Sequence, residues 1–277
     1  MAATTSATLD DLFVNIVAQA RFTAEEQSLL RNLVTVYNIE AQAGTTIQVP
    51  KYPAVAAADL TEGTDMTSTT VSTSSVSVTV GEVGAQVFLT DMAAMGAGNP
   101  ADELGTVLGN SIATKMDQDA IAVFDGFSTS LGATTVELTA AYLFQAAATL
   151  RANKAPGRLV GVFHPYQVYA LKANLTNTFA NPNGGDLQNE AMRTGYVGTI
   201  AGIDIYESAN ITVDGSGDAK GAVFAPEAIM MAMKRDFNLE PERDASNRGF
   251  ELNATAVYGV AELDDAYGVE MYFDAGL

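Results

Sequence analysis

One long helix, predicted over residues 99–126, constrains the fold of this chain more than any other feature. Asn99 can cap its first turn, Pro100 suits a first helical position that needs no N–H, and Gly126 ends it. An apolar stripe recurs at three- and four-residue steps: Leu104, Val107, Leu108, Ile112, Met116, Ala120 and Phe124. The polar residues are expected mostly away from this stripe: Asp102, Glu103, Asn110, Asp117 and Asp125. At about 1.5 Å per residue the helix would be roughly 35 to 40 Å long, which indicates an elongated molecule.

The composition supports a real core and excludes several function classes. The chain has 277 residues, 48% hydrophobic and 17% charged, which predicts about two domains. A net charge of -19 argues against non-specific binding to nucleic acid or anionic membranes, because phosphate contacts need clustered Lys and Arg. The densest basic group, Arg151, Lys154 and Arg158, is interpreted as a solvated helix end. The absence of cysteine excludes disulfides, thiolate nucleophiles and cysteine-based zinc sites.

Residues 7–38 predict an arm of two amphipathic helices. The second helix opens at Thr23 with Glu26 three positions later, which is the pattern of a capping box. Its apolar side would carry Leu29, Leu30, Leu33, Val34 and Tyr37. Such a short arm cannot bury this side alone, so we expect it to lie on another surface. The first residues lack the features of a signal peptide and no run reaches about 18 apolar residues, so we expect a soluble protein that is not exported.

A hairpin with a long excursion is predicted next. Residues 45–49 and 76–80 alternate as two strands, and Val71 is out of phase with Val76, so a break is expected near 73–75. The stretch between the strands is rich in Ala, Thr and Ser and has little that could form a core. More than about 20 residues without a core-forming pattern are unusual inside a compact domain. We therefore expect the excursion to pack on another molecule.

The second half of the chain predicts an α/β unit followed by strands. The expected elements are an Ala-rich helix after Leu138, a strand over 159–163, a short helix from Pro165, an irregular loop over 174–195, and strands over 197–206 and 222–224. Three β-like stretches follow, around residues 237–242, 250–260 and 268–273. We expect them to form an antiparallel sheet against the long helix. Pro241 places its strand at an edge, because proline cannot donate a ladder hydrogen bond.

Two motifs have residue types typical of functional sites but are better explained by structural roles. His164, the only histidine, lies at a strand end, where a capping or structural role is favoured over a catalytic base. Asp214, Ser216 and Asp218 have the spacing of the first three ligands of a calcium loop. Alanines occupy the positions of the loop glycine and the bidentate glutamate, so a hairpin turn is favoured.

Other chemical patterns are equally weak. Gly96 and Gly98 precede the long helix without the third glycine or the lysine of a phosphate loop, which favours a hinge. Adjacent carboxylates diverge along a helix or strand and are interpreted as caps or solvated turns: Asp10 with Asp11, Glu25 with Glu26, and Asp264 with Asp265. The methionines at 230, 231 and 233 are expected to fill core or interface gaps. We predict no catalytic, cofactor-binding or metal-binding residues, and a protein that is not an enzyme.

The order of these parts resembles the major capsid proteins of tailed bacteriophages with the Hong Kong 97 type fold. The segments that carry the resemblance are TTIQVPKYPAVAAADLTEGTD, VFLTD, LGNSIATKMDQDAIAVFDG, VGVFHPYQVYAL, GYVGTIAGIDIYES and GAVFAPEAIMMA. The resemblance implies an α+β fold with four units. These are an N-terminal arm over residues 1–43, an extended β-hairpin loop over 44–90, a peripheral domain over 91–137 and 226–277 with a spine helix and an antiparallel sheet, and an axial α/β domain over 138–225.

The function implied by the resemblance is self-assembly through pentamers and hexamers into the icosahedral shell around the genome of a tailed double-stranded DNA phage. The extended loop would lie over a neighbouring subunit, and arm and loop exchange would add avidity. The implied partners are further copies of the chain, a portal protein, a decoration protein and a separate scaffolding protein, since the arm begins almost at Met1. No membrane and no sequence-specific nucleic-acid contact is implied. The implied location is the virion, after assembly in the bacterial cytoplasm.

One family trait does not transfer, and two alternatives remain. Lys51 lies in the loop, but nothing marks the Asn and Glu partners of the inter-subunit cross-link that some members form, so no cross-link is predicted. The first alternative is another structural protein, such as a surface-array or adhesive protein, which the missing signal peptide opposes. The second is an α/β enzyme, which would need a convergent polar pocket that these residues do not supply.

Overall fold

The computed structural model describes residues 29–40, 44–53, 55–63, 65–66, 68–96, 101–178 and 198–276. Its helices and 3₁₀ turns (η) are η2 (Leu30–Asn32), α2 (Asp91–Gly96), α3 (Ala101–Ala122), η3 (Val123–Gly126), α4 (Ala140–Ala152), α5 (Pro165–Thr178), η4 (Pro226–Ala228) and η5 (Asp265–Tyr267). Its strands are β1 (Thr35–Asn38), β2 (Thr46–Lys51), β3 (Ser74–Thr79), β4 (Gly81–Thr90), β5 (Ser130–Gly132), β6 (Leu159–Phe163), β7 (Thr199–Ile200), β8 (Ile203–Glu207), β9 (Asp218–Phe224), β10 (Ile229–Asp244), β11 (Gly249–Glu262) and β12 (Gly268–Asp274). The first predicted helix of the arm and the capping box lie outside the described residues.

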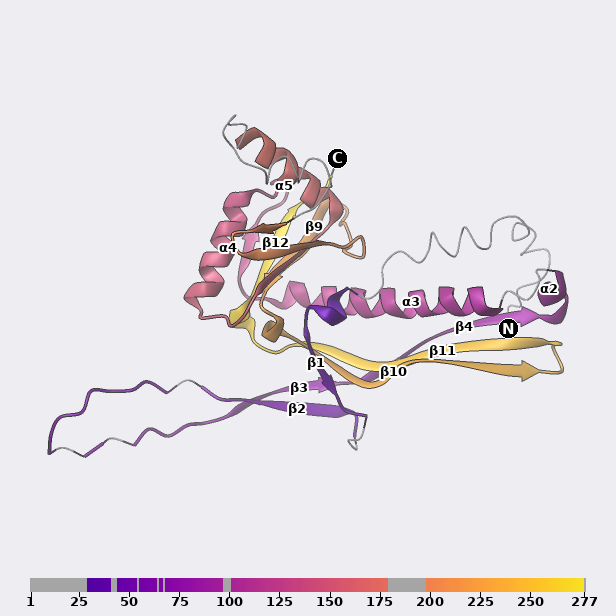
Figure 1. Ribbon diagram of the computed structural model, residues 1–277, viewed down its shortest axis with the longest axis horizontal. Helices are drawn as coiled ribbons and strands as arrows, with labels where there is room; N and C mark the ends of the chain where they lie inside the picture. Colours follow the sequence, from indigo (N-terminus) through magenta and orange to yellow (C-terminus); the bar gives the residue numbers. More distant parts are fainter. Residues whose placement is uncertain are drawn as a thin grey trace.

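The long helix is confirmed. α3 has 22 residues, and η3 continues it to Gly126. It runs along the sheet that contains β4, β10 and β11, as Figure 1 shows. The predicted stripe faces the core: Leu108, Ile112, Met116, Ala120 and Phe124 are at most 4% exposed, and Leu104 and Val107 are half-buried. Asn99 and Pro100, the predicted start, lie outside the described residues.

The sheet under α3 has the order β1-β10-β11-β4. β10 and β11 form a long antiparallel hairpin of 16 and 14 residues, and β11 pairs with β4 over the whole of β4. Alternate residues of β11, including Leu252, Ala254 and Ala256, are buried. β1 pairs only with Met230–Met233, so among the described residues the Pro241 end of β10 has a partner strand on one side only, which confirms its edge position.

Residues 35–38 form a strand and not the end of the predicted second helix. β1 lies parallel to the start of β10, and the short turn η2 precedes it. Leu30, Leu33 and Val34 are buried, so the apolar pattern was identified correctly, but the helical period was wrong. Thr35, Val36 and Tyr37 are β-branched or aromatic and pack well in a pleated strand, which explains the difference.

The α/β unit is confirmed as a six-stranded sheet with α4 and α5 beside it (Figure 1). Its strand order is β5-β12-β9-β6-β8-β7. All five residues of β6 are buried, as in a central strand covered on both faces. α5 continues to Thr178, beyond the short helix expected and into the stretch predicted as a loop. Residues 179–197 lie outside the described part of the chain.

The last strand joins the α/β sheet, which corrects the prediction of three strands against the long helix. β10 and β11 lie there, but β12 pairs with β9 and β5. The turn η5 separates β12 from β11, and Val269, Met271 and Phe273 are fully buried in the α/β core. A largely buried strand needs a central place in a covered sheet, and the α/β sheet offers it.

A shared core connects the two sheets. Phe124 in η3 and Phe224 in β9 are both fully buried, and their ring centroids are 5.6 Å apart. The same cluster includes Met116 of α3, Leu252 of β11 and Val162 of β6. Among the described helices, none combines the length and the apolar character needed to cross a membrane.

Candidate functional site

The excursion between β2 and β3 is the most exposed part of the described chain. The hairpin is confirmed, with Thr46 opposite Thr79 and Lys51 opposite Ser74. Every described residue from Tyr52 to Ser75 is exposed, and Figure 1 shows the excursion projecting away from both sheets. Its large apolar side chains are open to solvent: Tyr52 71%, Val55 56%, Leu60 66%, Met66 75% and Val71 45% exposed. Monomers rarely present so much apolar surface on one segment without covering it with a partner.

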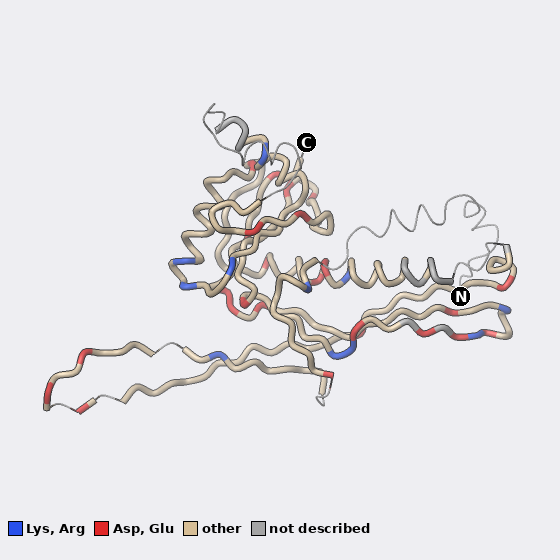
Figure 2. Tube along the Cα trace, in the orientation of Figure 1, with Lys and Arg blue, Asp and Glu red and all other residues tan. Residues whose placement is uncertain are grey.

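The excursion is also acidic. Asp59, Glu62 and Asp65 lie in it, and the sequence has no Lys or Arg from residue 52 to residue 80. Figure 2 shows acidic positions, coloured red, towards the far end of the excursion. The excursion can therefore present apolar and negative groups together.

The root of the excursion is firmly seated. Ile39, Val78, Val80, Met230 and Ala232 form a small buried cluster where the hairpin leaves the sheet. Lys51 Nζ lies 2.7 Å from Asp264 Oδ1, which ties β2 to the turn after β11. Burial, followed by the nearby carboxylate of Asp265, raises the pKa of Glu262 beside this pair. The hairpin thus starts in a fixed direction although its distal part is exposed.

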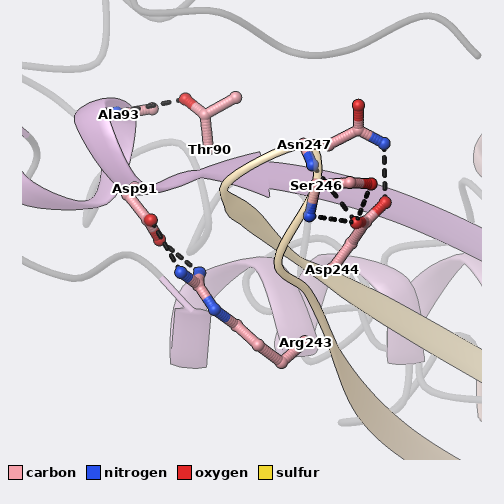
Figure 3. A network of polar contacts seen from close by, with 7 residues as sticks. All are labelled: Thr90, Asp91, Ala93, Arg243, Asp244, Ser246 and Asn247. Atoms are coloured by element: carbon pink, nitrogen blue, oxygen red, sulfur yellow. Dashed lines mark hydrogen bonds and ion pairs between the residues drawn. The ribbon is translucent and has the colours of Figure 1, made fainter.

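The opposite end of the long sheet carries a polar network (Figure 3). Arg243 at the end of β10 donates through both of its terminal nitrogens to Asp91, at 2.8 Å for the Nη2–Oδ2 contact, and it lies over the ring of Phe250 at 4.7 Å. The hydrogen bonds from Arg243 lower the pKa of Asp91. Thr90 Oγ1 accepts from the Ala93 N–H at the start of α2. The network joins β4, α2 and the β10–β11 turn at one place.

Asp244 organises the turn itself. It accepts hydrogen bonds from the backbone and side chains of Ser246 and Asn247, and these bonds lower its pKa to about 2. Beside this rigid turn, Met92 and Met95 of α2 are 73% and 80% exposed. The sheet end therefore offers a second exposed apolar surface on a fixed frame.

Asp117 occupies a position that the sequence did not predict. It was expected away from the apolar stripe, but its exposure is 0%. Its Oδ2 accepts from the Leu29 N–H at 2.9 Å, and its Oδ1 accepts from the Leu30 N–H at 3.2 Å. The segment that contains η2 covers this side of α3. The expectation was wrong because Asp117 is buried by residues far away in the sequence.

His164 and Asp214, the candidate site residues from the sequence, have structural roles. His164 Nδ1 accepts from the Tyr166 N–H at 3.3 Å, which is the capping role predicted, and partial burial lowers its pKa. Asp214 accepts from the N–H groups of Ser216 and Asp218 in a tight turn, so the hairpin interpretation is confirmed.

The remaining patterns also lie where they stabilise the fold. The three methionines from 230 to 233 are at most 4% exposed and belong to the core. Asp264 caps η5, as predicted, whereas Asp265 accepts a long-range hydrogen bond from the Ser128 N–H. Arg151 lies in the last turn of α4, Lys154 follows it and Arg158 precedes β6, and all three are exposed. Within the described ranges, no three acidic or histidine side chains are grouped so that they could hold a metal ion.

Known proteins provide two comparisons that agree with this geometry. The model of the family described as phage capsid protein matches residues 70–270. No curated protein matches the sequence. Among solved structures, the capsid of cyanophage P-SCSP1u is 19% identical with a TM-score of 0.71, covering 96% of this chain and 94% of that chain. The structure of Mycobacterium phage Che8 is 18% identical with a TM-score of 0.71, covering 88% and 91%. The head of Helicobacter pylori bacteriophage KHP40 is 10% identical with a TM-score of 0.71, covering 90% and 92%.

At such identities the solved structures establish the fold, and the family match establishes the relationship. The predicted Hong Kong 97 type fold is confirmed, as is the prediction of a structural protein of the virion and not an enzyme. The alternatives of a surface-array protein and an α/β enzyme are not supported. Because the family model covers more than half of the sequence, this chain belongs to the phage capsid protein family.

Proposed function

We propose that this chain is the major shell subunit of its phage and that its copies assemble through pentamers and hexamers into an icosahedral capsid. The observation that carries the proposal is the exposed excursion from Tyr52 to Ser75. Covering its five large apolar side chains would contribute about 25 cal/mol for each Å² removed from water. A neighbouring copy is the surface that a shell supplies at every position.

The excursion is suited to a repeated contact. The buried cluster at its base fixes the direction in which the hairpin leaves the sheet. The backbone and apolar side chains of its exposed part can contact a partner. Each contact would be modest, but closed symmetry repeats it around every ring and across the shell. The arm and the excursion belong to the same chain, so once one of them contacts a neighbour the other meets its partner at a raised effective concentration. The assembly is therefore more stable than any single interface.

We infer the roles of the four structural units from the resemblance, and we revise the boundary of one unit. Residues 1–43 would serve as the arm, 44–90 as the extended loop, 91–137 with 226–277 as the peripheral domain, and 138–225 as the axial domain at the centres of the rings. Pairing between β12 and β9 supports moving residues 268–274 to the axial unit. Scaffolding, portal and decoration proteins stay predictions from the resemblance.

The test is to replace residues 55–71 with a short Gly-Ser linker and to compare assembly by electron microscopy and light scattering. The full chain is expected to form closed shells, tubes or discrete rings as concentration and salt rise. The shortened chain is expected to keep its circular dichroism spectrum, because the described part of the removed segment contains no buried residue. Its free energy of unfolding should rise by about 1 kcal/mol, because a shorter loop costs less entropy to close.

Two results would contradict the proposal. One is closed shells of the same diameter from the shortened chain. The other is a full chain that stays monomeric at every concentration and salt and protects residues 44–80 from protease. The first would make the excursion an ordinary surface loop, and the second would show that it packs on its own subunit.

A further inference from the structure

The last part of the arm, from Leu29 onwards, is fastened to the long helix by a buried carboxylate. Asp117 is 0% exposed and lies in the C-terminal half of α3, and it accepts one backbone N–H with each carboxylate oxygen, from Leu29 and from Leu30. These N–H groups open the turn η2, where the first amides of a helical turn have no partner within the turn itself. A carboxylate from another element supplies the missing acceptors.

Further contacts hold the same short segment. Arg31 Nη2 lies 2.6 Å from Asp236 Oδ2 on β10, and its Nη1 donates to the other oxygen at 3.0 Å. Thr35 Oγ1 donates to the Pro226 carbonyl oxygen at 2.9 Å. β1 then enters the sheet. The chain from Leu29 onwards is therefore tied in turn to α3, to β10 and to η4.

A buried carboxylate such as Asp117 is unusual between two apolar surfaces. Leu30 and Leu33 are already buried against α3 and the sheet, and an apolar residue at 117 would add to that packing. Taking a carboxylate out of water is costly, and a buried charge of this kind contributes position more dependably than stability. Asp117 binds two backbone groups in one geometry, so it selects one register of the segment on the helix.

We propose that Asp117 is a positioning residue for assembly, which sets the place on α3 where the N-terminal arm joins the body. This inference rests on the proposed function, because it assigns the arm a fixed starting point relative to neighbouring copies. Leu29 then lies at the same place on α3 in every subunit. Without the carboxylate, residues 29–34 would sample other positions, and the contacts of the arm would lose their common geometry.

The test compares Asp117→Asn with Met116→Ala in the full chain. Asn keeps the size of the side chain but can accept from only one of the two N–H groups and turns donors towards the other. Met116 is the adjacent core residue and does not contact these amides through a hydrogen bond, so its truncation destabilises the core without removing the anchor. Hydrogen exchange of the Leu29 and Leu30 amides is measured in unassembled subunits, and shell yield and shape by electron microscopy.

Asp117→Asn is expected to speed exchange of these two amides by about tenfold or more relative to the amides of α3, and to lower the yield of regular shells. Met116→Ala should keep their relative protection and the shape of the shells. Unchanged protection in Asp117→Asn, or an equal assembly defect in both variants, would overturn the inference while leaving the proposed function intact. If wild-type chains stay monomeric at every concentration and salt and protect residues 44–80 from protease, the proposed function fails, and the exchange measurement still decides whether Asp117 anchors the segment.

A second variant covers the case in which Asp117→Asn does not fold. Arg31→Gln removes the ion pair to Asp236, whose two side chains are 39% and 51% exposed, so folding should tolerate it. It is expected to loosen the same segment, with faster exchange at Leu30 and a lower yield of regular shells. Wild-type exchange and wild-type shells in this variant would overturn the anchoring of the segment.

Discussion

The contact between Phe124 and Phe224 predicts how the two sheets unfold. Both rings are fully buried, 5.6 Å apart, in the core that includes residues of both sheets. Truncating a buried Phe to Ala costs about 3 to 5 kcal/mol through lost transfer energy and the cavity left behind. We therefore expect Phe124→Ala to lower the free energy of unfolding by about 4 kcal/mol. Phe144→Ala is the matched control, because that ring is 57% exposed on α4, and a change within about 0.5 kcal/mol is expected.

The assay is urea unfolding of unassembled subunits, followed by far-ultraviolet circular dichroism and by tyrosine fluorescence. With a slope of about 3 kcal/mol per molar urea, the midpoint of Phe124→Ala should fall by roughly 1.3 M. Both probes should report one shared transition, because the residue connects the two sheets through one core. A double-mutant cycle with Phe224→Leu should give a coupling of about 0.5 to 1.5 kcal/mol. Two separate transitions, of which only one moves, would refute the shared core, and so would equal effects at Phe124 and Phe144.

Two further predictions concern the hairpin root and the sheet end. A methyl group added at Gly259 would lie 2.5 Å from the Thr79 carbonyl oxygen, so Gly259→Ala should cost about 1 to 3 kcal/mol by displacing the hairpin root; an unchanged melting temperature would contradict this. The Asp244 carboxyl has a folded pKa of about 2, below its ordinary value of 3.8, so its contribution to stability is present above pH 4 and is lost as the pH falls towards 2. Nuclear magnetic resonance titration should place its midpoint near 2, and a midpoint near 3.8 would show that the turn hydrogen bonds do not form in solution.

Local sequence patterns predicted where helices and strands lie better than they predicted which strands pair with each other. The helix from 101 to 122, the hairpin from β2 to β3 and the buried strand β6 were read from period, capping and turn residues within a few positions. The described end of the second arm helix was predicted wrongly, because residues 29–34 are apolar at helical spacing, whereas the pairing of β1 with β10 decides the conformation of residues 35–38. β12 was assigned to the wrong sheet because its composition fits any covered sheet.

Of the candidate functional surfaces, the sequence likewise predicted the local one and missed those that depend on long-range contacts. The exposed excursion was predicted from its lack of core-forming residues, since that property belongs to the segment itself. The network of Asp91 with Arg243 was not predicted, because its partners are 152 positions apart and meet only when β4 and β10 lie on either side of β11. Asp117 was misplaced because helical periodicity describes one covered face, and here a second segment covers another.

The sequence by itself determined a long amphipathic helix, an α+β organisation, a core-poor excursion and the absence of a recognisable catalytic motif, because helix period, strand alternation and composition are local properties. Only the tertiary structure decided which sheet takes β12, that residues 35–38 become a strand, and that Asp117 is buried against amides 87 and 88 positions away. These outcomes depend on which surfaces meet. Strand pairing and the burial of a charge follow from contacts between distant segments, and a single sequence does not encode them within any one window.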